Sequence, residues 1–532
     1  MRYLSLVLFI TLFTIGYAEH QVKAKRPNIL VIVADDMGYS DVGCFGGEIA
    51  TPNIDQLAKE GIKLKNFYNN AKCGPSRASL LTGQYPHKGK LRTGVTFAEV
   101  LKTEGYRTIM TGKWHQSPKP TDRGWDRYYG LTDGCCNFWN PGIEAREGEP
   151  APGRKKQKGD KPRMWAIEDK EIAGYVPENK DFYTTDAFTD YAVDRLEEYQ
   201  EETKPFCLYL AYTAPHYPLH AWASDIKKYK DTYKVGWDVI REKRYQRMKK
   251  MGIITNNTLL SKRDEKVSSW SSLTTKEKQE KAHLMAVYAA MVDRMDQGIG
   301  RVIAKLKEIG KYDNTLILFM SDNGACAETV DLDVSVPAGG VASYRSLGQE
   351  WANASNTPYK KFKATSYEGG VKTPLIACWP NAIKHQEEVI TKRAHVIDIL
   401  PTLMEVAGAS YPTTVAGVKK LLPMDGKSML PILRGENKQP HEYLFWEYGA
   451  TYKAVLYHNL KLVEDKKSIK GETQQFLYKL DEDDNELKNV IDQYPKEAKK
   501  MAAAWNMWWK QDNIPINSTS KKGNLNFIIN EE

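Results

Sequence analysis

One short apolar run near the start of the chain does most to limit how it can fold. Residues 28–34 read N-I-L-V-I-V-A, with no charge and many β-branched side chains. Such a run is typical of a strand buried on both faces, as found in parallel sheets covered by helices. Residues 206–212 and 314–320 repeat the pattern, and residues 282–309 between them have helical spacing. The alternation predicts an α/β fold with a mainly parallel central sheet flanked by helices.

The end of the chain has a different pattern. Residues 443–448, 452–457 and 460–464 are strand-like runs, and residues 496–510 have the spacing of a helix. Strands spaced this closely leave no room for the crossover helices that parallel pairing requires. The tail therefore predicts a small antiparallel sheet with one helix.

Length and composition are compatible with two unequal domains. The chain has 532 residues, of which 41% are hydrophobic, so it can bury a large core. We predict a large domain over residues 19–435 and a smaller C-terminal α+β subdomain over residues 436–532.

The first residues have the pattern of a cleaved signal peptide. Residues 1–18 begin with Arg2, run uncharged from Tyr3 and end in Gly-Tyr-Ala. A membrane anchor is the alternative, but this run is shorter than the roughly 20 apolar residues of a spanning helix. We expect an exported protein, periplasmic or secreted after cleavage, without stable membrane insertion.

Charge and cysteine content restrict the partners. The net charge of +9 favours acidic ligands. Nothing resembles a nucleic-acid-binding module, so we expect an anionic substrate rather than nucleic acid. Seven cysteines are an odd number in an exported chain, so at least one is unpaired or chemically special. No cysteine or histidine spacing is typical of a zinc site, and the pairing of the cysteines stays open.

Acidic residues follow two of the expected strands. Asp35 and Asp36 come after the first strand, and Asp322 and Asn323 come after the strand that ends near Met320. Ligands of an open parallel sheet bind at the carboxyl ends of its strands, and oxygen ligands suit a hard cation such as calcium or magnesium. Taken alone, the first pair would be explained as a helix cap and the second as part of a turn.

The most informative segment begins at Cys73 and reads C-G-P-S-R-A-S-L-L-T-G. It resembles the C-x-P-S-R-x-x-L-L-T-G signature of the type I sulfatase family and matches it at every fixed position. The resemblance implies that Cys73 is oxidised to formylglycine, an aldehyde whose hydrate attacks sulfur. It also implies a formylglycine-generating or sulfatase-maturating enzyme as a partner. The alternative is an unmodified cysteine before a proline turn and a helix. Residues 135–141 and 288–298 are most similar to the arylsulfatase-like branch.

Six further segments extend the resemblance over most of the chain. They begin at Arg26 (R-P-N-I-L-V-I-V-A-D-D-M-G), Thr51 (T-P-N-I-D), Gly112 (G-K-W-H), Ala214 (A-P-H-Y-P), Ser321 (S-D-N-G) and Lys363 (K-A-T-S-Y-E-G-G). The family implies an alkaline-phosphatase-like fold and a single calcium ion. The metal site that the resemblance implies consists of Asp35, Asp36, the modified Cys73, Asp322 and Asn323, and the other pocket residues are Arg77, Lys113, His115, His216 and Lys363.

The chemistry of a sulfate monoester agrees with these assignments. Calcium would polarise a sulfate oxygen, while Lys113 and Lys363 would hold the remaining oxygens as point charges. Arg77 lies about one helical turn after Cys73 and could orient the hydrate and the metal ligands.

The resemblance also implies the proton transfers. One hydroxyl of the hydrate attacks sulfur with Asp322 as base, and His216 with Lys363 assists the departing alcohol. The second hydroxyl then loses its proton to His115 and expels sulfate, a step that a serine could not perform. Most histidines and lysines in a protein have no catalytic role. We assign one to His115, His216 and Lys363 only because each lies in a family motif.

The leading hypothesis is hydrolysis of a sulfate ester on a sulfated carbohydrate or an aryl sulfate. One alternative is a phosphate or phosphonate ester hydrolase of the related fold, which would usually have two zinc ions and more histidine ligands. The other is a non-catalytic glycan-binding protein in which Cys73 stays a thiol.

Substrate recognition is expected from the long polar stretches at residues 135–180 and 217–281, interpreted as loops over the binding face, and from the C-terminal subdomain. Aromatic side chains in these stretches could stack on a sugar or aryl ring, or could simply pack the loops onto the body. The sequence does not decide which sugar is bound, whether action is exo or endo, or the oligomeric state. The aromatic residues are Phe138, Trp139, Trp165, Tyr217, Trp222 and Trp237.

Overall fold

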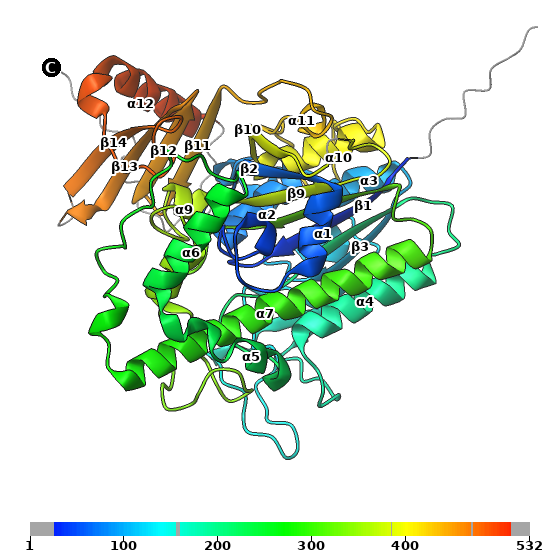
Figure 1. Cartoon of the computed structure of the whole chain (residues 1–532). Coiled ribbons are helices and arrows are strands. Elements are labelled where there is room, and N and C mark those ends of the chain that lie inside the picture. Colours follow the sequence, from blue (N-terminus) through cyan, green and yellow to red (C-terminus); the bar gives the residue numbers. More distant parts are fainter. Residues whose placement is uncertain (1–25, 156–159, 385, 470–471, 512–532) are drawn as a thin grey trace, which may run out of the picture.

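The computed structural model describes residues 26–155, 160–384, 386–469 and 472–511 (Figure 1). The signal peptide predicted at residues 1–18 lies outside these ranges and stays a prediction.

A ten-stranded sheet forms the body of the molecule, in the order β10-β2-β9-β8-β1-β7-β3-β4-β5-β6. Strand β1 lies between β7 and β8 and is parallel to both, as its buried apolar sequence predicts. Strand β9 is antiparallel to both its neighbours, and β5 and β6 are antiparallel additions at one edge. The strands are β1 (Asn28–Ala34), β2 (Ile62–Tyr68), β3 (Arg107–Gly112), β4 (Arg127–Leu131), β5 (Met164–Ile167), β6 (Lys170–Ala173), β7 (Phe206–Ala211), β8 (Thr315–Ser321), β9 (Lys372–Cys378) and β10 (Val389–His395).

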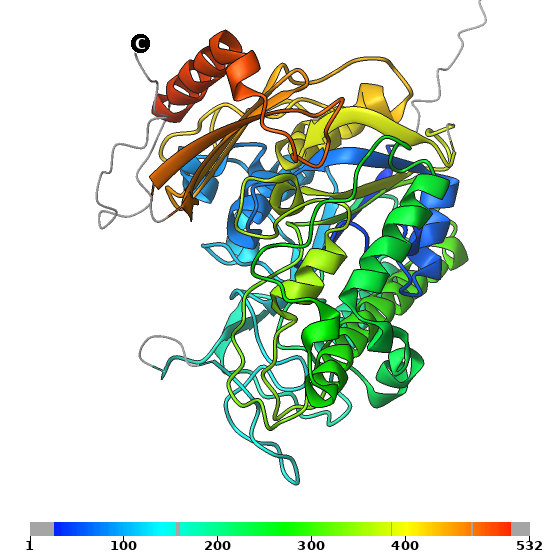
Figure 2. The ribbon, with the colours of Figure 1, turned by 60° about the vertical axis from the view of Figure 1, so that its left-hand side comes forward.

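Helices cover both faces of this sheet (Figures 1 and 2). Successive residues of β1 point to opposite faces, so Ile29, Val31 and Val33 join one core while Leu30 and Ile32 join the other. The core with Leu30 includes residues of α1 (Pro52–Glu60), α4 (Thr184–Glu198), α5 (Ala223–Tyr229), α6 (Trp237–Lys250) and α7 (Thr275–Glu308), and the core with Ile29 includes residues of α2 (Cys73–Thr82), α3 (Phe97–Thr103), α10 (Ile399–Ala407) and α11 (Leu430–Leu433).

Helix α7 begins earlier than the apolar spacing from residue 282 predicts. Thr274 accepts a hydrogen bond from the backbone of Glu277, whose side chain accepts one from the backbone of Thr274. This capping box satisfies donors at the helix start and lets a polar first turn be helical.

The two long polar stretches contain more regular structure than the loops that the sequence suggested. Strands β5 and β6 lie in the first stretch, and helices α5 and α6 lie in the second. Four of the six aromatic side chains considered for substrate stacking are buried and pack the body instead, whereas Tyr217 and Trp222 are half-buried. The four buried side chains are Phe138, Trp139, Trp165 and Trp237.

The C-terminal residues form the antiparallel sheet that their spacing predicts, with a fourth strand that the sequence analysis missed. One face of this sheet packs on Trp505 of α12, and the other packs through Trp446 on Tyr68 and Val371 of the body. The fold class is therefore confirmed, while the boundary at residue 436 stays a prediction. The elements are β11 (Tyr443–Tyr448), β12 (Tyr452–Tyr457), β13 (Leu460–Ile469), β14 (Glu472–Lys479) and α12 (Pro495–Lys510).

A buried group of charges joins this small sheet to the body, and we name it the junction cluster: Glu368, Lys372, Lys461 and Glu486. Lys461 Nζ lies 2.6 Å from Glu368 Oε1 and 2.9 Å from Glu486 Oε1. Lys372 Nζ lies 3.3 Å from the other oxygen of Glu368.

None of the helices formed by the described residues combines the length and the apolar composition needed to cross a membrane.

Candidate active site

The two acidic pairs lie side by side at the carboxyl end of the central strands. Asp35 and Asp36 follow β1, and Asp322 and Asn323 follow β8, with which β1 pairs through Ala34 opposite Ser321. The backbone N–H of Asp322 donates to Ala34 O at 3.2 Å. All four side chains are buried. The parallel pairing thus brings together the oxygen ligands that the sequence placed after two separate strands.

Asp36 has a left-handed backbone, with φ of 64°. Its backbone N–H donates to Asp322 Oδ1 at 3.3 Å, and Asn323 Nδ2 donates to Asp36 Oδ1 at 2.6 Å. A left-handed aspartate is unfavourable by itself and persists where its surroundings hold it. These contacts turn the Asp36 carboxylate toward the end of β8.

Helix α2 brings Cys73 and Arg77 to the same place. Cys73 is the first helical residue, and Arg77 lies one turn later. Arg77 Nε donates to Asp322 Oδ2 at 2.9 Å and Nη1 donates to Lys113 O at 3.1 Å, while Nη2 lies 3.7 Å from Asp35 Oδ1. The guanidinium is buried and therefore ties the helix to the carboxylates.

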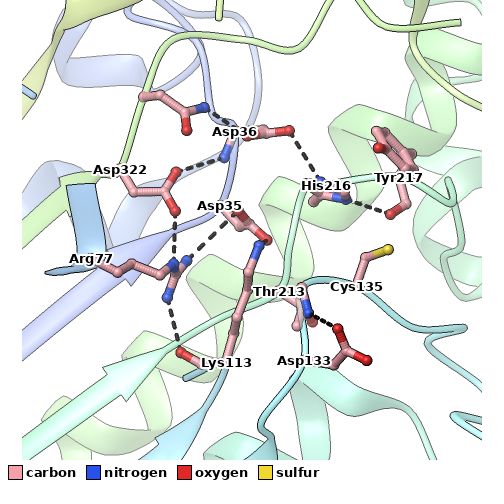
Figure 3. A network of polar contacts seen from close by, with 12 residues as sticks. Asp35, Asp36, Arg77, Lys113, Asp133, Cys135, Thr213, His216, Tyr217 and Asp322 are labelled. Atoms are coloured by element: carbon pink, nitrogen blue, oxygen red, sulfur yellow. Dashed lines mark hydrogen bonds and ion pairs between the residues drawn. The ribbon is translucent and has the colours of Figure 1, made fainter. Parts of the chain in front are cut away.

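Two lysines complete the ring of buried charges, and Figure 3 shows one of them, Lys113, beside Asp35. Lys113, which follows β3, donates to Asp35 Oδ2 at 2.6 Å, and Lys363 donates to Asp36 Oδ2 at 2.7 Å. Burial by itself lowers the pKa of each lysine, but Asp35 and Asp36 respectively outweigh it, so both pKa values lie above the ordinary one. Both side chains therefore stay charged. We name this group the site cluster: Asp35, Asp36, Arg77, Lys113, Asp322 and Lys363.

The carboxylates of the site cluster respond differently to burial. Burial raises the pKa of Asp36, but Lys363, His216 and Lys113 outweigh it and bring the value below the ordinary one. Asp322 keeps a pKa raised to about 6, because burial outweighs the attraction of Arg77.

Two histidines face this ring. His216 follows β7, and its Nδ1 lies 2.6 Å from the carbonyl oxygen of Tyr217, so Nδ1 carries the proton and Nε2 is directed toward Asp36 Oδ2 at 3.5 Å. Burial, with Lys363 and Lys113, lowers the pKa of His216 to about 3 despite Asp36. The imidazole is therefore neutral near pH 7.

His115 lies over the first turn of α2 with a left-handed backbone, φ 54°. A Cβ placed on Gly74 would lie 3.7 Å from its Cε1. Its Nδ1 is buried and has no hydrogen-bond partner among the described residues. Burial and Lys113 lower the pKa of His115 well below its ordinary value, so it is also neutral.

The donor set fits a hard cation. Asp35 Oδ1 and Asn323 Oδ1 are buried and accept no hydrogen bond from the part of the chain that the structure describes. A buried oxygen without a donor requires an explanation, and a bound cation is one that suits these two neighbouring oxygens. Potential ligand atoms of Asp35, Asp36 and His216 lie within 4.8 Å of one another. Oxygens in the majority favour calcium or magnesium over zinc.

Sequence reasoning missed two polar residues at this site, Gln116 and Glu328. Gln116 Nε2 donates to Gly74 O at 2.7 Å and thereby holds the start of α2. Glu328 lies 3.1 Å from Lys72 Nζ and accepts a hydrogen bond of 2.9 Å from Tyr217 OH. Neither Gln116 nor Glu328 belongs to a family motif. Only the position of Gln116 directly after the G-K-W-H segment could have indicated its role.

Comparison with known proteins agrees with this geometry. A family model described as Sulfatase matches residues 27–409, and one described as N-sulphoglucosamine sulphohydrolase, C-terminal, matches residues 360–508. The chain belongs to the sulfatase family. The resemblance first seen in the segment that begins at Cys73 is confirmed, and the protein is a sulfuric ester hydrolase.

Curated relatives and solved structures support the same conclusion for this sulfatase. An uncharacterised sulfatase of Schizosaccharomyces pombe is 33% identical over 91% of this chain and 94% of its own length. An arylsulfatase of Klebsiella aerogenes is 33% identical over 78% and 93%. The crystal structure of Ps i-CgsB in complex with k-i-k-neocarrahexaose has a TM-score of 0.65 and 25% identity, and covers 93% of this chain and 95% of that one. Neither the phosphate ester hydrolase nor the non-catalytic alternative gains support from these relatives.

Proposed function

We propose that this sulfatase hydrolyses sulfate monoesters with a formylglycine made from Cys73 and one bound calcium ion, and that its substrate is a sulfated carbohydrate or an aryl sulfate. One observation carries the proposal: Cys73 begins a helix whose first turn adjoins three buried cations, three carboxylates and two neutral histidines.

The cysteine thiol is a poor nucleophile as it stands. Burial raises the pKa of Cys73 above its ordinary value despite Lys113 and Lys363, whereas the reactive form of a thiol is the thiolate. Formylglycine supplies a hydrated aldehyde, with one hydroxyl to attack sulfur and a second to permit release of sulfate. Cys73 is 3% exposed, so a maturating enzyme would have to reach it before folding is complete.

Asp35, Asp36, Asp322 and Asn323 are the residues proposed to hold calcium, which would polarise a sulfate oxygen. The unbonded Asp35 Oδ1 and Asn323 Oδ1 support this assignment. His216 also lies close enough to be a ligand, but calcium prefers oxygen, so we assign His216 to proton transfer.

The lysines and Arg77 provide fixed positive charge. Lys113 and Lys363 reach Asp35 and Asp36, and in this position their ammonium groups can hold oxygens of a bound sulfate. Arg77 fixes the Asp322 carboxylate, which is proposed as the base for the attacking hydroxyl. Preorganised charges of this kind lower the barrier because they need no rearrangement during the reaction.

The roles of the two histidines are assigned from the ring nitrogens that form no hydrogen bond. The Nδ1 proton of His216 is directed to the carbonyl of Tyr217, so Nε2 of the neutral ring carries no proton of its own. Lys363 Nζ and His216 Nε2 both face Asp36 Oδ2, so the Lys363 ammonium would supply the proton that Nε2 passes to the departing alcohol. His115 offers an unbonded Nδ1 beside Gly74, from which it can accept a proton at the first turn of α2.

Saccharide and aryl substrates each have support among the relatives. The solved structure of Ps i-CgsB, a protein 25% identical, is a complex with k-i-k-neocarrahexaose, and the enzyme of Klebsiella aerogenes is named an arylsulfatase. The net charge of +9 suits a polyanion. We therefore expect turnover of a generic aryl sulfate and a larger kcat/KM for a sulfated saccharide. Export, which rests on residues 1–18, is part of this proposal.

Mass spectrometry of the peptide that contains Cys73 tests the nucleophile in protein from its native host. An aldehyde is expected, and a free thiol in fully active protein would contradict the proposal. Cys73→Ala should lower turnover by at least about a thousandfold, the scale seen when an enzyme loses its nucleophile. Cys73→Ser should trap a sulfated enzyme or lose turnover.

Elemental analysis tests the metal, with about one calcium ion per chain and no stoichiometric zinc expected from the oxygen ligands. Two tightly held zinc ions would favour the phosphatase-like alternative. A panel of sulfated saccharides assayed for released sulfate tests the substrate, and activity confined to aryl sulfates would count against a carbohydrate role.

A further inference from the structure

We propose that a basic pocket beside the active site binds a second anionic group of the substrate. The substrate class would then be a saccharide that carries a sulfate or carboxylate in addition to the sulfate that is removed. This inference rests on the proposed function and names the substrate class more closely. We use "basic pocket" for the cavity whose wall includes Cys135, Arg154, Lys155, Lys161, Arg163 and Tyr344.

The basic pocket has an excess of positive charge. Two of its four cations face carboxylates: Arg154 lies 2.9 Å from Asp160 Oδ1, and Arg163 lies 3.3 Å from Asp133 Oδ1. Lys155 and Lys161 are exposed and form no ion pair with any residue that the structure describes. Four cations against two carboxylates attract an anion to the rim of the pocket, where the exposed Lys155 and Lys161 lie.

The basic pocket and the active site share a wall. A Cβ placed on Gly134 would lie 2.9 Å from His115 Nε2, so the segment from Asp133 to Cys135 touches a residue of the active site. In the basic pocket the same segment holds Arg163 through Asp133, and Cys135 Sγ lies 3.9 Å from Tyr344 OH. One layer of chain therefore separates the two sites.

Aromatic residues continue the same surface. The rings of Tyr217 and Tyr344 have centroids 6.2 Å apart, and the rings of His216 and Tyr217 have centroids 4.0 Å apart. Tyr217 is half-buried, so part of this residue is exposed beside His216. A saccharide with its scissile sulfate near His216 would thus contact Tyr217 and Tyr344 first. The lysines of the basic pocket lie farther along the same surface.

The backbone beside the basic pocket is held in place by hydrogen bonds. Gly153 N donates to Val341 O at 2.8 Å, and Asn137 Nδ2 donates to Gly153 O at 3.0 Å and to Val341 O at 2.7 Å. A fixed backbone before Arg154 costs less entropy on binding than a free loop would.

The test uses the full-length enzyme and the double variant Lys155→Gln/Lys161→Gln. The matched control is Lys59→Gln/Lys499→Gln, which removes the same charge from exposed positions outside the basic pocket. Turnover of a singly charged aryl sulfate is measured in the presence of two competitors: a disulfated disaccharide, and a monosulfated disaccharide with a uronate carboxylate. Competition reports binding whether or not the competitor is itself hydrolysed.

The wild type and the control should be inhibited with similar inhibition constants. In the pocket variant the inhibition constant of at least one competitor should rise about tenfold, as expected for two lost ion pairs at the rim of a site. This rise is counted after division by any change in the KM of the aryl sulfate. The competitor affected more identifies the second group as sulfate or carboxylate. Equal inhibition of the variant and the wild type, or no inhibition of the wild type, would overturn the inference. Failure of the proposed function would differ, because the wild type would then release no sulfate from any substrate.

Discussion

The site cluster and the junction cluster are both buried groups of balanced charge, yet they differ in how completely the charges are paired. In the junction cluster, each oxygen of Glu368 and Glu486 has a cation or a donor within 3.3 Å, with Tyr68 OH and the backbone N–H of Glu368 supplying two of the contacts. In the site cluster, Asp35 Oδ1 has its cation 3.7 Å away, and the adjacent Asn323 Oδ1 has no hydrogen-bond partner among the described residues.

This difference distinguishes buried charges that stabilise the fold from buried charges that can bind a ligand. A buried ion pair is tolerated when hydrogen bonds satisfy its atoms, and an unsatisfied buried atom is costly. In the junction cluster Glu486 Oε1 accepts no hydrogen bond, but the ammonium of Lys461 lies 2.9 Å from it, and the cluster joins the small sheet to the body. The site cluster keeps unsatisfied oxygens, as a metal site requires. One segment links the two clusters, because Lys363 belongs to the first and Glu368 to the second.

The largest effect is expected from Lys113→Met in the site cluster. Loss of a preorganised charge should lower kcat/KM for an aryl sulfate by about 10²–10³-fold. The variant should also lose stability because Asp35 keeps its buried charge without its cation, and calcium should restore part of that loss. Thermal denaturation with and without calcium, together with kinetics, checks both points. Turnover equal to that of the wild type would contradict the role of Lys113.

The matching change in the junction cluster, Lys461→Met, should act on stability instead. It leaves Glu368 and Glu486 buried without their shared cation, which should cost about 3–5 kcal/mol of unfolding free energy. Calcium should stabilise this variant no more than it stabilises the wild type. Urea denaturation measures the loss, with Lys59→Met as an exposed control expected to stay within about 0.5 kcal/mol. Specific rescue by calcium would show that the two clusters are not distinct in function.

The smallest effect is a loss of stability in acid, and it comes from a contact outside both clusters. His87 packs against Trp508 of α12, with ring centroids 4.4 Å apart, and burial lowers its pKa to about 3 from an ordinary value of 6.5. Between these values the unfolded chain takes up a proton that the folded chain does not. Stability is therefore present above pH 6.5 and is lost as the pH falls, by about 1.4 kcal/mol per pH unit.

His87→Phe removes this titration and keeps an aromatic ring against α12. Between pH 6.5 and pH 5 the variant should lose about 2 kcal/mol less unfolding free energy than the wild type, measured by urea denaturation at each pH. Parallel loss in both proteins would place the acid sensitivity elsewhere.

Much of the site could be predicted because its residues lie in local patterns. The buried run of β1 and the aspartates after it have an identifiable sequence, and the segment from Cys73 is long enough to exclude chance. The close spacing of β11, β12 and β13 likewise predicted an antiparallel sheet, because crossover connections need length.

What the sequence determined by itself was therefore the two acidic pairs, the motif around Cys73 and the strands with a clear local pattern, each of which depends on neighbouring residues. These strands are β1, β7, β8, β11, β12 and β13. Only the tertiary structure decided that β9 enters the sheet antiparallel, that Trp165 and Trp237 are buried, and that Lys461 joins Glu368 across 93 residues. These outcomes depend on which distant segments meet. A charged or aromatic side chain carries no local sign of the partner that will bury it, because burial and pairing are energies of contact between elements rather than properties of a segment.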